Sequence, residues 1–127
     1  MAYNLPRSQI IVQGPVVDLT IVGNHNIFST KGIFIVVAVT LNAVNLTGNI
    51  GLPGLSLGFT SPNYNDIINQ SFGYSTSNSG NYQYSTVQSI SNALPVPAST
   101  TLVLRVAVND STATTNTQSI YIHGFYM

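Results

Sequence analysis

The ionisable side chains of this chain are few, and their types limit the chemistry that they could perform. Glutamate and cysteine are absent, so acid–base catalysis by paired carboxylates would depend on three widely spaced aspartates, Asp18, Asp66 and Asp110. The histidines, His25 and His123, lie at no spacing from them that is typical of a zinc site or a calcium loop. Serine is abundant, so its occurrence together with histidine and aspartate does not indicate a catalytic triad. The sequence predicts that the chain is not an enzyme and has no catalytic, cofactor-binding or metal-binding residues.

The C-terminal histidine has two interpretations. His123 lies between aromatic residues in Tyr121-Ile122-His123-Gly124-Phe125, within a segment that alternates as a β-strand does. A packed neutral histidine is the simpler interpretation, and a ligand or catalytic role is the alternative.

Composition indicates a folded module with few options for charged partners. The chain has 127 residues, which fit one domain, and 44% of them are hydrophobic while only 5% are charged. Its net charge is zero, so no basic patch is expected to bind nucleic acid or an anionic membrane. A near-zero net charge also removes a barrier to association. We therefore expect a homo-oligomer.

The N-terminal sequence and the hydropathy pattern bear on where the protein is found. Residues Met1–Gly14 contain no continuous apolar segment followed by a small-residue cleavage site, so a secretory signal is not expected. The most hydrophobic stretch, Ile33–Val39, is far shorter than the roughly 20 residues of a membrane-spanning helix. We expect synthesis in the cytoplasm and no membrane partner.

Short runs of β-branched and aromatic residues, divided by Gly, Pro, Asn and Ser, predict an all-β fold. The expected fold is an antiparallel β-sandwich, jelly-roll-like, with about eight strands. Residues 1–14 would form an N-terminal arm or first strand, and residues 15–127 a single sandwich domain. Asn63–Asn69 could make one helical turn, and the polar stretch Asp110–Gln118 is expected to be a loop. The eight runs are Gln9–Val12, Val16–Val22, Asn26–Ser29, Ile33–Val44, Leu55–Phe59, Tyr82–Ser89, Thr101–Val108 and Ser119–Tyr126.

Two of the expected strands do not alternate cleanly between apolar and polar residues. Ile33–Leu41 is apolar on both faces, and alternation predicts that Phe34, Val36 and Ala38 share one of them. Thr101–Val108 has one apolar face and one mixed face. Either a loop of the same chain covers the second face, or that face is a subunit interface. In an interface Arg105 would need a carboxylate such as Asp110 or Asp66, whereas on a wet face it would be solvated. The candidate interface residues are Ile33, Phe34, Val36, Ala38, Val103, Arg105 and Ala107.

Three segments resemble small β-sandwich virion proteins of tailed bacteriophages. They are Leu57-Gly58-Phe59 with Asn63-Tyr64-Asn65-Asp66-Ile67, then Thr101-Leu102-Val103-Leu104-Arg105-Val106, then Ile120–Tyr126. They cover roughly the C-terminal two-thirds of the chain. The resemblance implies a location in the virion, as a capsid decoration (cement) protein, a head fibre or a tail-fibre tip, often as a trimer that contacts the major capsid protein or another virion protein. It implies no catalytic residue.

Two classes of function follow from these expectations. The first is a bacteriophage structural protein, a decoration or cement protein that stabilises the shell through surface contacts, and the small size of the chain favours it. The second is a receptor- or glycan-binding tip module of a phage fibre, with a host-surface glycan as partner, because aromatic and amide side chains can hold sugars. The candidate ligand surface consists of Tyr64, Asn65, Phe72, Tyr74, Tyr82 and Tyr84.

Overall fold

The computed structural model describes residues 9–48, 51, 53–69, 85–89 and 94–127. Within these ranges the chain forms seven β-strands and no helix, which confirms the all-β prediction; the sequence had indicated about eight strands. The strands are β1 (Ile10–Asp18), β2 (Gly23–Ser29), β3 (Phe34–Gly48), β4 (Gly54–Gly58), β5 (Ser85–Ser89), β6 (Thr101–Val108) and β7 (Ala113–Tyr126).

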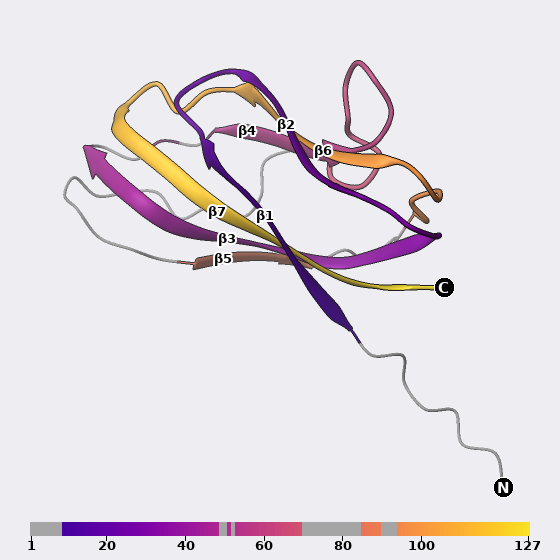
Figure 1. Ribbon diagram of the computed structural model, residues 1–127. Helices are drawn as coiled ribbons and strands as arrows, with labels where there is room; N and C mark the ends of the chain where they lie inside the picture. The colour runs from indigo at the N-terminus through magenta and orange to yellow at the C-terminus, as the bar shows by residue number, and fades with distance from the viewer. Residues whose placement is uncertain (1–8, 49–50, 52, 70–84, 90–93) are drawn as a thin grey trace, which may run out of the picture.

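The strands form two antiparallel sheets, one of four strands in the order β1-β7-β3-β5 and one of three strands in the order β2-β6-β4. Figure 1 shows them as two layers, with β1, β7, β3 and β5 below and β2, β6 and β4 above. Strands that follow one another in the sequence lie in opposite sheets throughout. Each connection therefore crosses from one layer to the other.

The two layers share one hydrophobic core. Leu102, Leu104 and Val106 of β6 are fully buried, as are Ile120 and Ile122 of β7, and all five belong to the same cluster. These residues alternate along their strands, because side chains at every second position point to the same face of a sheet. The alternation of β6 was correctly predicted up to Val106, whereas Val108 is exposed.

An irregularity in β3 corrects the expected division of its two faces. The pairing with β7 shifts by one residue between Val36 and Ala38, so Val37 is an extra residue of β3. Phe34 and Val36 point into the core before the shift, and Val39 points there after it. The prediction that Phe34, Val36 and Ala38 share one face is therefore wrong, because an inserted residue exchanges the two faces of a strand.

Three other local predictions differ from the structure. β7 begins at Ala113, inside the stretch expected to be a loop, because Asn116 and Gln118 are buried on its inner face. β1 continues through Gly14-Pro15, where its pairing with β7 shifts between Gln13 and Val16. In place of a helical turn over 63–69, the chain forms a turn and then an isolated antiparallel bridge between Ile68 and Leu57.

Candidate functional site

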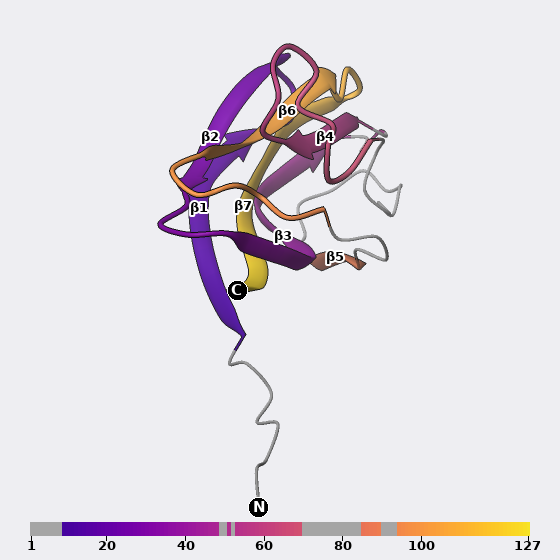
Figure 2. The same ribbon diagram turned by 90° about the vertical axis from the view of Figure 1, so that its right-hand side faces the viewer.

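A loop of residues 59–69 follows β4 and lies against the outer side of the β2-β6-β4 sheet (Figure 2). Gly58 permits this approach, because a Cβ at that position would lie 2.6 Å from the backbone carbon of Tyr64. Backbone bonds then return the loop to the strand: the N–H of Leu57 donates to the carbonyl of Ile68 at 3.0 Å, and the N–H of Ile68 donates to the carbonyl of Leu57 at 3.0 Å. The loop is therefore fixed at both ends on β4.

Asp66 holds the first part of this loop. Its Oδ2 accepts hydrogen bonds from the backbone N–H groups of Phe59 and Thr60, both at 2.8 Å. Partial burial raises the pKa of Asp66, but the hydrogen bonds from Phe59 and Thr60 outweigh this effect and lower the pKa below its ordinary value of 3.8. The carboxylate form is thus the one that closes the loop.

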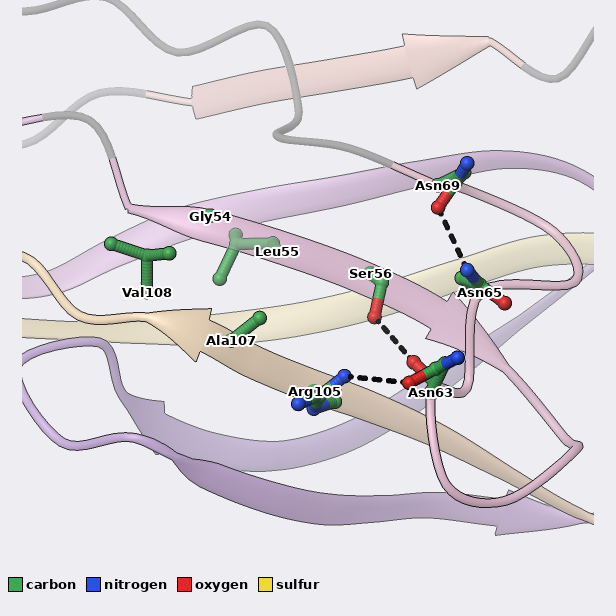
Figure 3. A pocket seen from close by; sticks show the side chains of 9 residues that line it. All are labelled: Gly54, Leu55, Ser56, Asn63, Asn65, Asn69, Arg105, Ala107 and Val108. Atoms are coloured by element: carbon green, nitrogen blue, oxygen red, sulfur yellow. Dashed lines mark hydrogen bonds between the residues drawn. The ribbon is translucent and has the colours of Figure 1, made fainter.

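A hollow of about 430 Å³ lies between this loop and the two strands β4 and β6. Figure 3 shows Arg105 and Asn63 side by side, with Asn65 and Asn69 on the opposite side of β4. Apolar and small residues complete the lining. The full lining consists of Gly54, Leu55, Ser56, Asn63, Asn65, Asn69, Arg105, Ala107 and Val108. We call this feature the β4–β6 hollow.

Arg105 supplies the positive charge of the β4–β6 hollow. It lies on β6 opposite Ser56 of β4, and its Nη1 donates to Oδ1 of Asn63 at the long distance of 3.4 Å. In the described ranges the carboxylates are engaged elsewhere: Asp66 by Phe59 and Thr60, Asp18 by Thr20, and Asp110 by its own turn. Neither carboxylate that the sequence offered as a partner binds Arg105.

Amide side chains line other parts of the hollow, with Asn63 beside the guanidinium and Asn65 and Asn69 across β4 from it. Asn63 is held in place because Oγ of Ser56 donates to its backbone carbonyl at 3.0 Å. Nδ2 of Asn65 donates to Oδ1 of Asn69 at 2.8 Å. Each amide has both donors and an acceptor, so this pair retains the Asn65 oxygen and the Asn69 nitrogen for other partners. The hollow therefore presents one cation and three amides over a partly apolar lining.

Of the candidate ligand surface predicted from the sequence, only Tyr64 and Asn65 lie among the described residues. Asn65 lines the β4–β6 hollow, and Tyr64 lies next to it in the same loop with a left-handed φ of 45°. A non-glycine residue in this region of φ is uncommon and often lies at a binding site. The other proposed members, Phe72, Tyr74, Tyr82 and Tyr84, lie outside the described residues.

The candidate interface residues are separated by the fold. Phe34 and Val36 are fully buried in the core and cannot contact a partner, while Ile33 is exposed at 46%. Val103 lies on the outer side of β6 yet is buried, and Ala107 is exposed beside the hollow. Ala38 lies on the outer face of the other sheet. The seven residues therefore do not form one surface.

A different surface, on the outer face of the four-stranded sheet, has the character expected of an interface. The register places Ile11, His123 and Ala38 in one row across β1, β7 and β3, and Gln13, Tyr121 and Thr40 in the next. Ile11 is 61% exposed and Val16, further along β1, is 56% exposed. We call this surface the β1–β7–β3 face; Asp18, at the end of β1, is its one charged side chain among the described residues, and its other residues are Ile11, Gln13, Val16, Tyr121, His123, Phe125, Ile35, Ala38 and Thr40.

The residues considered for catalysis lie apart. Nε2 of His123 forms a hydrogen bond with Oγ1 of Thr40 at 2.8 Å, whereas His25 lies on β2 of the other sheet. Among the residues that the structure describes, no three His, Cys, Asp or Glu side chains could hold a metal ion together. In the same residues no helix is long and apolar enough to cross a membrane.

One sequence motif runs against the prediction that the chain is not an enzyme, and Ser56 lies at its centre. Gly54-Leu55-Ser56-Leu57-Gly58 matches the Gly-x-Ser-x-Gly run of hydrolase nucleophiles. That function requires a turn from a strand into a helix with a histidine beside the serine. Here Ser56 lies within β4, is buried, and donates its hydroxyl to the carbonyl of Asn63. The pattern thus belongs to the strand, where its two glycines admit Val108 and the loop.

Comparison with known proteins gives little further information. Among solved structures, the chain is similar to one described as a cyanophage Pam1 capsid asymmetric unit, with 14% sequence identity and a TM-score of 0.49. The similarity covers 100% of this chain and 91% of that one. No family model and no curated protein matches the sequence. At this identity and TM-score, the similarity carries no conclusion about function.

Proposed function

We propose that this chain is a structural protein of a bacteriophage virion, a decoration or cement protein that binds the shell and stabilises it. It would act as a homotrimer located in the virion, with the β1–β7–β3 face as the contact between its subunits, and the trimer would be the form that attaches to the shell. The partners would be the major capsid protein or another virion protein. No catalytic step, cofactor, nucleic acid or membrane enters this proposal.

The observation that carries the proposal is the partly apolar β1–β7–β3 face, on which Asp18 is the one charged side chain among the described residues. Ile11 and Val16 are both more than half exposed there, and Tyr121 and Phe125 lie between them and β3. Apolar area of this kind on a sheet face is typical of protein contact surfaces, whose centres are depleted in charge and enriched in aromatic residues. The resemblance of three sequence segments to phage virion proteins gives the class of partner. The low similarity to a phage capsid structure agrees with this class but is too weak to carry it.

We also infer that the sandwich is a jelly roll. Its strands alternate between the sheets, and the orders β1-β7-β3-β5 and β2-β6-β4 match those of an eight-stranded jelly roll in which the strand beside β4 is not among the described residues. At that edge of β4 the isolated bridge joins Leu57 to Ile68. This bridge supports a position for an eighth strand next to β4. The jelly-roll fold occurs in viral capsid proteins and in lectins.

The proposal is tested by the copy number of this chain in purified phage particles that contain it, measured by quantitative mass spectrometry. A decoration protein should be present at a copy number comparable to that of the shell protein. A copy number far below that of the shell protein, typical of a fibre tip, or absence from the particle would overturn the proposal.

A matched pair of variants tests the surface. Ile11→Lys places a charge in the β1–β7–β3 face and should lower incorporation into particles. Ile21→Lys makes the same change at an equally exposed isoleucine outside that face and should leave incorporation unchanged. Equal incorporation of the two variants would exclude a role of this face in incorporation.

A further inference from the structure

We propose that the β4–β6 hollow is a binding site for a carboxylate-bearing saccharide, with the carboxylate on Arg105 and the sugar hydroxyls on the asparagine amides that line the hollow. This site lies on the sheet opposite to the β1–β7–β3 face. It specifies a class of ligand for the alternative function, glycan binding, that the sequence left open. It does not depend on attachment to a shell.

The charge in the hollow indicates an anionic ligand. Arg105 is half-buried, and its hydrogen bond to Asn63 is at the limit of that interaction at 3.4 Å. The described carboxylates are all bound elsewhere, so the guanidinium keeps most of its donors for a ligand. A planar guanidinium fits a carboxylate with two parallel hydrogen bonds, and a partly desolvated site strengthens them.

The amides indicate that the anion belongs to a sugar. Asn63, Asn65 and Asn69 line the hollow, and the Asn65–Asn69 hydrogen bond leaves an acceptor on one amide and a donor on the other. Vicinal hydroxyl groups donate and accept at once, so they match such a pair. Ala107 and Val108 add small apolar contacts of the kind that the C–H face of a sugar ring can use.

The loop that carries the amides is built to keep them in place. Ser56 anchors the backbone of Asn63 at 3.0 Å, and Asp66 binds the two N–H groups at the start of the loop. Tyr64, between the amides, has a left-handed φ of 45° that the surrounding contacts maintain. A site whose loop is ordered before binding loses less entropy when the ligand enters. The volume of about 430 Å³ lies within the range of small-ligand sites.

Isothermal titration calorimetry with two probes that differ only in the carboxylate tests the proposal on the full chain. Methyl β-D-glucuronide should bind at least about tenfold more tightly than methyl β-D-glucoside, because hydrogen bonds to charged groups are worth more than neutral ones. Arg105→Gln should remove this preference and leave the glucoside affinity unchanged. Asn65→Ala should weaken both probes.

Lys31→Gln provides the control, because it removes a positive charge from an exposed lysine outside the hollow. It should change neither affinity. Circular dichroism and the urea midpoint would show that each variant is folded. Loss of the preference for the glucuronide in Arg105→Gln, with an unchanged urea midpoint, would therefore support the site.

Three results of the calorimetry with the two sugar probes would overturn the proposal. They are no binding of either probe, equal affinity for the glucuronide and the glucoside, and an Arg105→Gln variant that still prefers the glucuronide. Tighter binding of an acidic peptide than of the glucuronide would also overturn it, by assigning Arg105 to a protein carboxylate. Failure here would leave the attachment proposal intact, because that one is measured by copy number and by variants of the other sheet.

Discussion

The ring of Phe34 on β3 occupies the space beside Gly124 on β7, where a larger residue would have its side chain. A Cβ at Gly124 would lie 2.6 Å from Cε1 of Phe34 and would also overlap the carbonyl oxygen of Ile35. Phe34 is fully buried and packs edge-on against Tyr126 with ring centroids 5.0 Å apart. The absent side chain at Gly124 is therefore what allows β3 and β7 to pair over the core.

We predict that Gly124→Ala lowers the free energy of unfolding by about 3 kcal/mol, because overpacking of a filled core forces the backbone and Phe34 to move. Urea denaturation measures this change. Gly23→Ala is the matched control, since no atom lies within 4 Å of a Cβ at that position, and it should change stability by less than about 1 kcal/mol. Similar midpoints for the two variants would contradict the close packing described here.

A second prediction concerns Asp110, which is 1% exposed. Its Oδ1 accepts from the N–H groups of Gly51 at 3.0 Å and Ala113 at 3.2 Å, and its Oδ2 accepts from Nδ2 of Asn116 at 2.8 Å. Asp110→Ala leaves these buried donors without their acceptor and should cost about 3 kcal/mol of unfolding free energy. Asp18→Ala, which releases only contacts to Thr20, should cost about 1 kcal/mol in the same urea experiment. A smaller loss at Asp110 than at Asp18 would be inconsistent with this network.

The loop around the β4–β6 hollow should loosen in acid through Asp66. Its pKa is lowered in the folded protein, so its stabilising effect is complete above the ordinary value of 3.8 and is lost as the pH falls through the lower folded value. We expect the amide hydrogens of Phe59 and Thr60 to exchange faster at a pH well below 3.8 than at neutral pH, after correction for intrinsic exchange. Asp66→Asn should remove most of this pH dependence, and an unchanged profile in that variant would argue against the role of Asp66.

The sequence predicted the fold class because alternating apolar residues are visible without a structure. The core positions Leu102, Leu104 and Val106 follow from period-2 alternation, and the absence of any helical pattern excluded a helical fold. The extra residue Val37 was not predictable from this pattern, because Ile33–Leu41 is apolar at nearly every position and fits either face. The interface prediction inherited that error, since it grouped Phe34 and Val36 with Ala38.

The candidate site was less predictable than the fold, because it depends on where a loop lies. Arg105 and Asn65 were both named from the sequence, but as parts of separate surfaces, and Asn63 and Asn69 had no role beyond bounding a turn. They meet because Gly58 and Asp66 fold the loop back onto β4. Likewise Asp110–Gln118 was expected to be a loop from its polar composition, whereas Asp110, Asn116 and Gln118 are buried and form a chain of hydrogen bonds inside the sandwich.

The last prediction is that the protein forms a homotrimer through the β1–β7–β3 face. Ile11 and Val16 are more than half exposed on a face whose one charged side chain among the described residues is Asp18, at the end of β1. A stable interface needs about 800 Å² from each partner. Light scattering at micromolar concentration should give about three times the 13.5 kDa monomer mass. The double variant Ile11→Lys, Val16→Lys should give the monomer mass, because it places like charges in the contact.

Ile21→Lys and Arg105→Glu should keep the wild-type mass, since Ile21 lies between β1 and β2 and Arg105 lies on the opposite sheet. A wild-type protein of monomer mass would remove the trimer, whereas dissociation by Arg105→Glu alone would move the interface to the β2-β6-β4 sheet.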